Sequence, residues 1–209
     1  QASVLLMKLY QVFRKYEANL VEINPLVITK EGNIVAVDGK FNLDDSALYK
    51  HNRFSITKDY YNNDIEYKAA QDGIPYIQFD GDIGMMVAGA GLANVVFDLI
   101  HYYGGTVANY LEFGGPNYHK GKECMKMMLE TKPKCILIAT FGTIARADVM
   151  AEGIVEAGKE MKPEIPIVTV IRGTGEEKAR ELLQSVGLES LEDTEEAVKK
   201  AVELVGGAC

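Results

Sequence analysis

From Asp82 to the end of the chain, short apolar runs alternate with amphipathic stretches of helical spacing. The apolar runs occupy residues 85–89, 106–111, 135–140 and 166–171. The amphipathic stretches lie between and after them, at residues 91–103, 118–131, 147–161, 175–186 and 193–205. This alternation predicts parallel strands joined by helices that cover both faces of one sheet, and therefore an α/β domain.

Glycine-containing turns follow the expected strands and precede a helix. They lie at Gly89-Ala90-Gly91, Gly114-Gly115, Gly142 and Gly173-Thr174-Gly175. In a doubly wound sheet these turns lie beyond the carboxyl ends of the strands, which is where such sheets bind ligands. We therefore expect residues 81–209 to form a flavodoxin-like domain with a ligand site at this edge.

Residues 136–153 carry the clearest candidate site, because an apolar β-branched run ends in Phe-Gly-Thr and a polar-flanked helix follows. A helix start presents unpaired backbone N–H groups and the positive end of the helix dipole, so an anion docked there meets donors that already face it. Gly142 lets the backbone approach the anion, while Arg146 and Asp148 add charge and orientation. The pattern indicates a phosphate or carboxylate site, although the same junction also occurs in α/β domains as a plain connection.

The first 54 residues follow a different pattern. Residues 1–16 have apolar side chains at helical spacing, and two β-rich runs at 20–29 and 33–41 are joined by Lys30-Glu31-Gly32-Asn33, a hairpin loop. A helix and a hairpin cannot enclose a core by themselves, so we expect residues 1–54 to be the carboxyl-terminal part of a larger domain. Residues 55–80 are rich in Asn, Asp and Tyr and predict a connector with a short helix.

Three polar residues of the expected hairpin form a candidate metal site. Glu22 and Asn24 are two residues apart on one run and share a face, and Asp38 on the returning run can lie opposite them. Oxygen ligands suit Mg²⁺, which proteins often hold together with the phosphates of a nucleotide. The alternative is that Asp38-Gly39 is only a turn and Asn24-Pro25 only interrupts a strand.

Composition excludes two kinds of partner. The chain has a formal net charge of -8, a pI near 5.0 and no stretch rich in Lys and Arg, so it lacks the cationic surface that nucleic acids require. No apolar run approaches the roughly 20 residues that cross a bilayer. We expect a cytoplasmic protein, or one of the mitochondrial matrix in a eukaryote. Cys124, Cys135 and Cys209 are irregularly spaced, which is typical of reduced thiols.

Three segments together resemble a known family. Residues 21–48 (VEINPLVITKEGNIVAVDGKFNLDDSAL) resemble the end of the ATP-grasp domain in β subunits of the succinyl-CoA synthetase family. Residues 81–93 (GDIGMMVAGAGLA) and 141–154 (FGTIARADVMAEGI) resemble the CoA-ligase domain of the same subunits. The resemblance runs in order over nearly the whole chain. It implies an acid–thiol ligase of the NDP-forming type, which acts in the tricarboxylic acid cycle in its succinate form.

The resemblance implies roles for individual residues. Asn24 and Asp38 match the magnesium ligands, and Glu22 matches a residue that handles a phosphohistidine near the nucleotide. The helix start that meets the phosphohistidine and the acid is matched by Gly142, Thr143, Ile144, Ala145, Arg146 and Asp148. We place Asp82, Gly114 and Arg172 with them as substrate-binding residues.

The resemblance also implies a partner. In this family the phosphorylated histidine and most of the CoA site belong to an α subunit, so this chain alone is expected to be inactive. His51, His101 and His119 stand in no similar motif, and we expect them to be ordinary surface or packing histidines. The cofactors implied are Mg²⁺, CoA and either ATP or GTP, since the sequence does not indicate the base.

The acid is left open between two candidates. Where succinate enzymes commonly have GGI-x-RCD, this chain has Gly142-Thr143-Ile144-Ala145-Arg146-Ala147-Asp148, and residues 108–118 and 170–175 look partly like ATP-citrate lyase. In that relative an arginine matching Arg172 binds citrate, whose third carboxylate needs another cation. Arg172 can instead pair with Glu176 or Glu177 at its own helix start. We expect succinate, with citrate as the alternative.

Two other functions are alternatives to a ligase. A non-catalytic flavodoxin-like domain could use the same glycine turns to bind a regulatory anion. A dinucleotide-dependent oxidoreductase fits poorly, because Gly89-Ala90-Gly91 lacks the third glycine of G-x-G-x-x-G.

Overall fold

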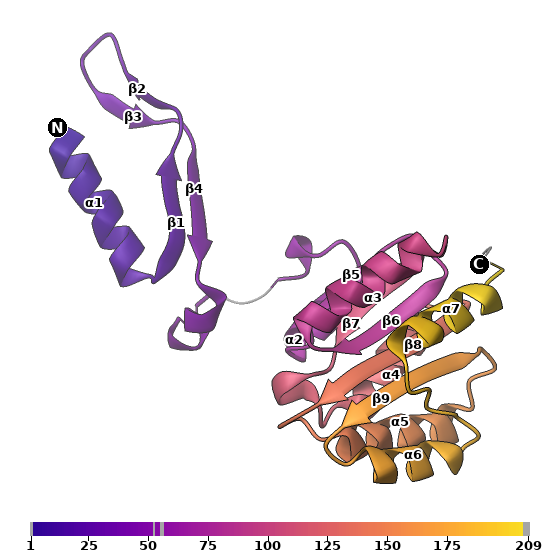
Figure 1. Ribbon diagram of the computed structural model, residues 1–209. Coiled ribbons are helices and arrows are strands. Elements are labelled where there is room, and N and C mark those ends of the chain that lie inside the picture. Colours follow the sequence, from indigo (N-terminus) through magenta and orange to yellow (C-terminus); the bar gives the residue numbers. More distant parts are fainter. Residues whose placement is uncertain (1, 52, 55–56, 207–209) are drawn as a thin grey trace. The chain divides into compact units, whose positions relative to one another are not determined.

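The computed structural model describes residues 2–51, 53–54 and 57–206. The chain divides into two compact units, residues 1–57 and residues 58–209 (Figure 1). No helix within the described ranges combines the length and the apolarity that crossing a bilayer requires.

The first unit contains one long helix and an interrupted hairpin. Its elements are α1 (Ala2–Lys15), β1 (Ala18–Ile23), β2 (Leu26–Ile28), β3 (Ile34–Ala36), β4 (Gly39–Leu43) and the 3₁₀ helix η1 (Asp45–Lys50). The hairpin predicted for residues 20–41 is present, but each run is split into two strands, so that β1 pairs with β4 and β2 with β3, both antiparallel. The first break lies at Asn24-Pro25, since proline has no N–H to donate to a strand ladder.

This unit buries little apolar surface. Of its described residues only Ala18 and Ala47 are buried, and the apolar side chains Leu6 and Ile28 are 64% and 74% exposed.

The second unit is a five-stranded sheet with helices on both faces. Its strands are β5 (Tyr76–Gln78), β6 (Ile83–Ala88), β7 (Val107–Glu112), β8 (Cys135–Gly142) and β9 (Ile167–Gly173), in the order β5-β7-β6-β8-β9. β6 to β9 run parallel, and β5 pairs antiparallel with the edge of β7. The predicted flavodoxin-like, doubly wound sheet is therefore confirmed, with one added antiparallel strand.

Alternate side chains of each central strand enter two separate cores, one on each face of the sheet. The helices are α2 (Asp64–Gln71), α3 (Ala90–Tyr102), α4 (Gly121–Glu130), α5 (Ala147–Met161), α6 (Glu176–Gln184) and α7 (Thr194–Leu204), with short 3₁₀ turns η2 (Lys58–Tyr60) and η3 (Gly115–Asn117). α2, α4, α5 and α6 pack on the face of Ile136 and Ile138, and α3 and α7 pack on the face of Leu137 (Figure 1). Asp193 caps α7 by accepting the N–H of Glu196 at 2.9 Å.

The prediction for residues 55–80 needs correction. The short helix is present as α2, but residues 64–78 are not a free connector, because Ala69, Ile74 and Tyr76 are buried in the core of the second unit. β5 has only three residues, and a run that short shows no periodicity in a sequence.

Candidate functional site

The loop between β8 and α5 presents a row of backbone donors. β8 ends at Gly142 and α5 begins at Ala147, so residues 143–146 lie outside both elements. Within the described part of the chain, the backbone N–H groups of Thr143, Ile144, Ala145 and Arg146 have no acceptor. Thr143, Ile144 and Arg146 are exposed, and Ile144 is 92% exposed. Four neighbouring donors without an acceptor at the carboxyl edge of a parallel sheet are suited to an anion.

The helix start itself contributes less than the sequence predicted. The N–H of Ala147, the first residue of α5, donates to the carbonyl oxygen of Thr174 at 2.9 Å. The donors available to an anion are therefore those of the loop that precedes the helix.

The loop after β9 braces the loop after β8. The N–H of Thr174 donates to the carbonyl oxygen of Gly142 at 2.9 Å, which adds a second backbone bond between the two loops. Gly173 has φ +103°, and a Cβ there would lie 2.0 Å from the Gly142 carbonyl oxygen, so only glycine fits. A Cβ on Gly142 would lie 2.6 Å from the carbonyl oxygen of Ala145, so this position needs glycine too.

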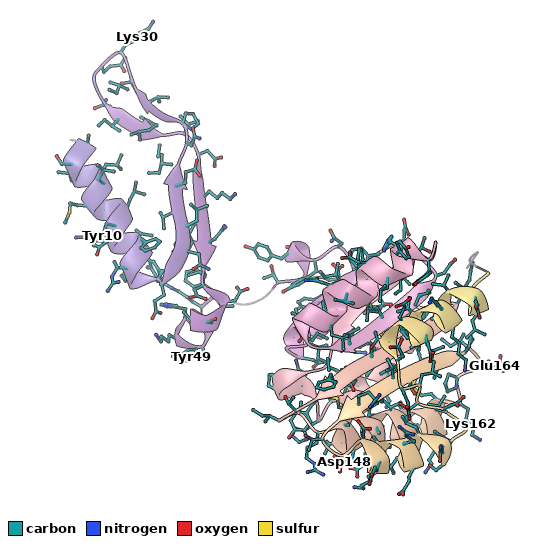
Figure 2. All side chains as sticks on the ribbon, viewed as in Figure 1. Tyr10, Lys30, Tyr49, Asp148, Lys162 and Glu164 are labelled. Atoms are coloured by element: carbon teal, nitrogen blue, oxygen red, sulfur yellow. The ribbon has the colours of Figure 1, made fainter. Side chains whose placement is uncertain are left out.

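Arg146 and Asp148 form a bidentate ion pair at the start of α5. Arg146 Nε donates to Asp148 Oδ1 at 3.0 Å, and Arg146 Nη2 donates to Asp148 Oδ2 at 2.9 Å. The Asp148 side chain is 5% exposed and that of Arg146 is 51% exposed. The hydrogen bonds from Arg146 hold the pKa of Asp148 below its ordinary value. In Figures 1 and 2, Asp148 lies at the edge to which the parallel strands β8 and β9 point, and Lys162 and Glu164 lie at the opposite edge.

Arg172 is held by its own surroundings. Its Nε donates to Glu176 Oε2 at 3.1 Å, and its Nη1 donates to the Glu192 carbonyl oxygen at 2.6 Å. The same Glu176 oxygen accepts the N–H of Gly173 at 2.8 Å. This backbone bond, followed by the bond from Arg172, lowers the pKa of Glu176. The pairing with Glu176 that the sequence left open is therefore the one observed.

Asp82 and Gly114, the other predicted substrate-binding residues, lie at different edges. Gly114 follows β7 at the carboxyl edge, and a Cβ there would lie 3.2 Å from the backbone of Ala88 and Gly89. Asp82 precedes β6 and so lies at the amino edge, where its carboxylate pairs with Lys134 at 3.0 Å. The structure does not bring Asp82 to the loop of residues 143–146, and its assignment as a substrate-binding residue is corrected.

The candidate metal residues gather at one end of the β1–β4 ladder. Asn24 Nδ2 donates to Glu22 Oε1 at 3.1 Å, and the N–H of Asn24 donates to the Asp38 carbonyl oxygen at 3.3 Å. Asp38 Oδ1 accepts the N–H of Gly39 at 2.8 Å. Asn24 Oδ1 and Asp38 Oδ2 have no partner in the described residues, and such oxygens fit Mg²⁺. Since no group of three or more His, Cys, Asp or Glu side chains suited to a metal occurs in the described ranges, a cation here needs further oxygens, such as phosphates.

The histidines and cysteines have ordinary surroundings. His51 bonds Glu17 at 2.9 Å, His101 Nδ1 lies 2.9 Å from the Phe97 carbonyl oxygen, and His119 stacks on Tyr118. Cys124 and Cys135 are free and buried, and burial raises the pKa of each thiol to about 12. Cys209 lies outside the described residues.

Comparison with known proteins identifies the family. The model of the CoA-ligase family matches residues 86–204, which include every strand and helix of the sheet domain from β7 to α7. This chain belongs to the CoA-ligase family. The resemblance to the β subunits of NDP-forming acid–CoA ligases is thereby confirmed.

Relatives of this CoA-ligase chain fall into two groups. It is 59% identical over 207 residues to the ADP-forming sulfoacetate-CoA ligase subunit SqwK of an Acholeplasma species, covering 99% of this chain and 52% of that protein. It is 53% identical to the corresponding subunit SauC of Bilophila wadsworthia, covering 99% of this chain and 56% of that protein. It is 43% identical to the succinate–CoA ligase [ADP-forming] subunit beta of Persephonella marina, covering 100% of this chain and 55% of that protein. The chain thus spans about half the length of the curated relatives it matches.

A solved structure supports the fold. Methanosaeta concilii ATP citrate lyase, in complex with (3S)-citryl-CoA, matches 95% of this CoA-ligase chain and 59% of its own with a TM-score of 0.79. The sequence identity is 21%, so this likeness concerns the fold alone.

Proposed function

We propose that this chain is part of a subunit of an ADP-forming acid–CoA ligase, which joins a carboxylic acid to CoA with ATP and requires a partner α subunit. The observation that carries the proposal is the loop of residues 143–146, whose four backbone donors have no acceptor in the described residues and lie at the carboxyl edge of a CoA-ligase domain. Phosphoryl and carboxylate groups are the anions that such a ligase must hold.

The acid that we propose is sulfoacetate. The two sulfoacetate-CoA ligase subunits are 59% and 53% identical to this chain, whereas the beta subunit of the Persephonella succinate ligase is 43% identical. A sulfonate has three oxygens and keeps its charge at every physiological pH, so it needs several donors at once. The backbone donors of residues 143–146, the exposed Thr143 hydroxyl and the outer edge of Arg146 supply them.

Succinate is the alternative acid, and citrate is disfavoured. Citrate has a third carboxylate, for which Arg172 was the candidate cation. Arg172 uses Nε and Nη1 to bond Glu176 and the Glu192 carbonyl oxygen, and its side chain is 35% exposed against 51% for Arg146, so it is less available to a further anion.

The other roles follow the family resemblance. Asn24 and Asp38 would hold Mg²⁺, with Glu22 beside them to orient the phosphohistidine of the partner subunit. Bound Mg²⁺ supplies positive charge that neutralises the phosphates of ATP. The backbone donors of Thr143, Ile144, Ala145 and Arg146 and the Arg146 guanidinium then hold the anion at the second site, and Gly142 ends the strand that leads into this loop. The CoA site is proposed to lie mainly on the partner.

The test is thioester formation by the assembled ligase. The subunit that contains this chain is combined with its partner, and ATP, Mg²⁺, CoA and one acid at a time are added, with sulfoacetate, succinate, citrate and malate in parallel. We expect sulfoacetyl-CoA, identified by mass, with kcat/KM about tenfold above that for succinate. Thioester formation with succinate as the best acid would contradict the choice of acid, and no thioester with any acid would contradict the ligase.

A pair of variants locates the activity. Arg146→Ala removes a proposed acid contact and is expected to reduce kcat/KM about tenfold or more. Glu164→Gln removes one charge at the opposite edge of the sheet, where Glu164 is exposed, and is expected to leave kcat/KM unchanged (Figure 2).

A further inference from the structure

Asp148 combines a charge with almost complete burial. Its side chain is 5% exposed, although the preceding residues 143, 144 and 146 are exposed. A buried carboxylate is tolerated only when its oxygens are paired, so the surroundings of Asp148 must be arranged around it.

Both carboxylate oxygens are engaged by cations of this chain. Arg146 contacts them with Nε and Nη2, at 3.0 and 2.9 Å, and Lys178 Nζ of α6 lies 3.6 Å from Oδ2. A two-point contact between a carboxylate and a guanidinium fixes the plane of the guanidinium, which a single contact does not. Lys178 also bonds Glu152 at 2.8 Å, and that carboxylate is half exposed.

Backbone of the neighbouring loop closes over the same carboxylate. Gly175, the residue before α6, has φ +85°, and a Cβ there would lie 2.7 Å from Asp148 Oδ1. The loop after β9 therefore leaves room for the Asp148 carboxylate and for no added atom.

We infer that Asp148 is a positioning residue, which does not touch the acid but holds the Arg146 guanidinium in the orientation that receives it. The inference rests on the proposed function, because that assigns Arg146 to the acid. It replaces the prediction that Asp148 binds substrate, since a carboxylate whose oxygens are already paired repels an anionic acid.

Two opposing effects are combined in this arrangement. Asp148 reduces the positive charge that the acid meets. It also orders the Arg146 side chain, which is 51% exposed, before the acid binds, so less conformational entropy is lost on binding. Lys178 is balanced by Glu152 at 2.8 Å, so the charge that the acid meets is that of the Arg146–Asp148 pair, in which the guanidinium is 51% exposed and the carboxylate only 5% exposed. Ordering is therefore expected to prevail.

A double-mutant cycle on the assembled ligase tests this. Arg146→Ala and Asp148→Ala are each expected to raise the KM for the acid about tenfold and to leave the KM values for ATP and CoA unchanged. Because Asp148 acts through Arg146, the double variant is expected to have the acid KM of Arg146→Ala alone. A merely structural defect would instead lower kcat with all KM values unchanged. The inference is overturned if Asp148→Ala raises the KM for the acid by the same factor in the wild type and in Arg146→Ala, or if Asp148→Ala lowers that KM.

Asp148→Asn keeps the volume of the side chain and serves where Asp148→Ala does not fold. It can accept only one of the two Arg146 bonds, so its acid KM is expected to lie between those of the wild type and of Arg146→Ala. An unchanged acid KM would count against the inference.

A glycine pair tests the same point without removing a charge. Gly175→Ala places a methyl group against Asp148 Oδ1 and is expected to raise the acid KM as Asp148→Ala does. Gly187→Ala is the matched control, because Gly187 has φ +78° but nothing within 4 Å of an added Cβ. Equal changes of the acid KM in both variants would assign the effect to backbone strain and overturn the role of Asp148.

The failure of the proposed function is distinguishable from the failure of this inference. If the wild type forms no thioester with any acid, the proposed function fails. The coupling of Arg146 to Asp148 is then measured in thermal unfolding of the same three variants, where non-additive shifts support the pair and additive shifts refute it.

Discussion

The backbone N–H of Ala147 donates to the carbonyl oxygen of Thr174 at 2.9 Å, so the first residue of α5 is bonded to the loop that follows β9. Together with the bond from Thr174 N–H to Gly142, this makes the two loops one structural unit. A substitution in residues 173–175 is therefore expected to alter the conformation of residues 143–146, although the two segments belong to different βα connections.

Gly173→Ala is expected to lower the free energy of unfolding by about 3 kcal/mol, because the new methyl group meets the Gly142 carbonyl and φ is unfavourable. Urea denaturation followed by circular dichroism measures this. Gly187→Ala, with similar φ and open space around Cβ, is expected to cost about 1 kcal/mol. Equal losses in the two variants would show that the contact with Gly142 does not matter.

Arg172→Ala is expected to leave the KM for sulfoacetate, succinate and citrate within about twofold of the wild-type values. The reason is that the guanidinium is bonded to Glu176 and to the Glu192 carbonyl. Its loss should instead reduce stability slightly, since the side chain is 35% exposed and the pair is partly screened. Steady-state kinetics with the three acids checks this, and a selective rise in the KM for citrate would restore Arg172 as a citrate ligand.

Low pH is expected to reduce the stability of the second unit through protonation of Asp148. Arg146 holds the pKa of Asp148 below its ordinary 3.8 in the folded chain, so the pair stabilises the fold fully above about pH 4. That contribution is lost as the pH falls through the lower folded pKa. Asp148→Asn is expected to be less stable than wild type at pH 7, with a difference that shrinks below pH 4. Urea denaturation between pH 3 and pH 7 checks this, and a difference that stays constant with pH would contradict the assignment.

Asp38→Ala is expected to abolish phosphorylation of the partner's histidine, because it removes one of the two oxygens proposed to hold Mg²⁺. Labelling of the partner subunit from radioactive ATP measures this. Asp45→Ala removes an exposed carboxylate from the same unit and is the control. Normal labelling in Asp38→Ala would remove Asp38 from the nucleotide site.

The parts of the fold that repeat a long pattern could be predicted from the sequence. The apolar run at residues 135–140 predicts a strand and the helical spacing over residues 147–161 predicts a helix. Both are present, as β8 and α5, because each pattern extends over enough residues to be recognised. The three residues of β5 are too few to show a repeating pattern, and they form a strand because they pair with the edge of β7.

The site could be predicted only in part, because local pattern does not specify tertiary partners. The glycine at 142 indicated the loop, but the bond from Ala147 to Thr174 joins residues that are distant in the sequence. The burial of Asp148 under Gly175 has the same origin. Asp82 lies next to an apolar run, but at its amino end, and a residue before a strand belongs to the edge opposite the site.

The most direct test of the proposed acid site is a structure of the assembled ligase with sulfoacetate bound. We expect one anionic group of the acid to accept hydrogen bonds from backbone N–H groups of residues 143–146, with Arg146 contacting it and still paired to Asp148. An acid bound elsewhere, with those N–H groups turned to solvent, would contradict it.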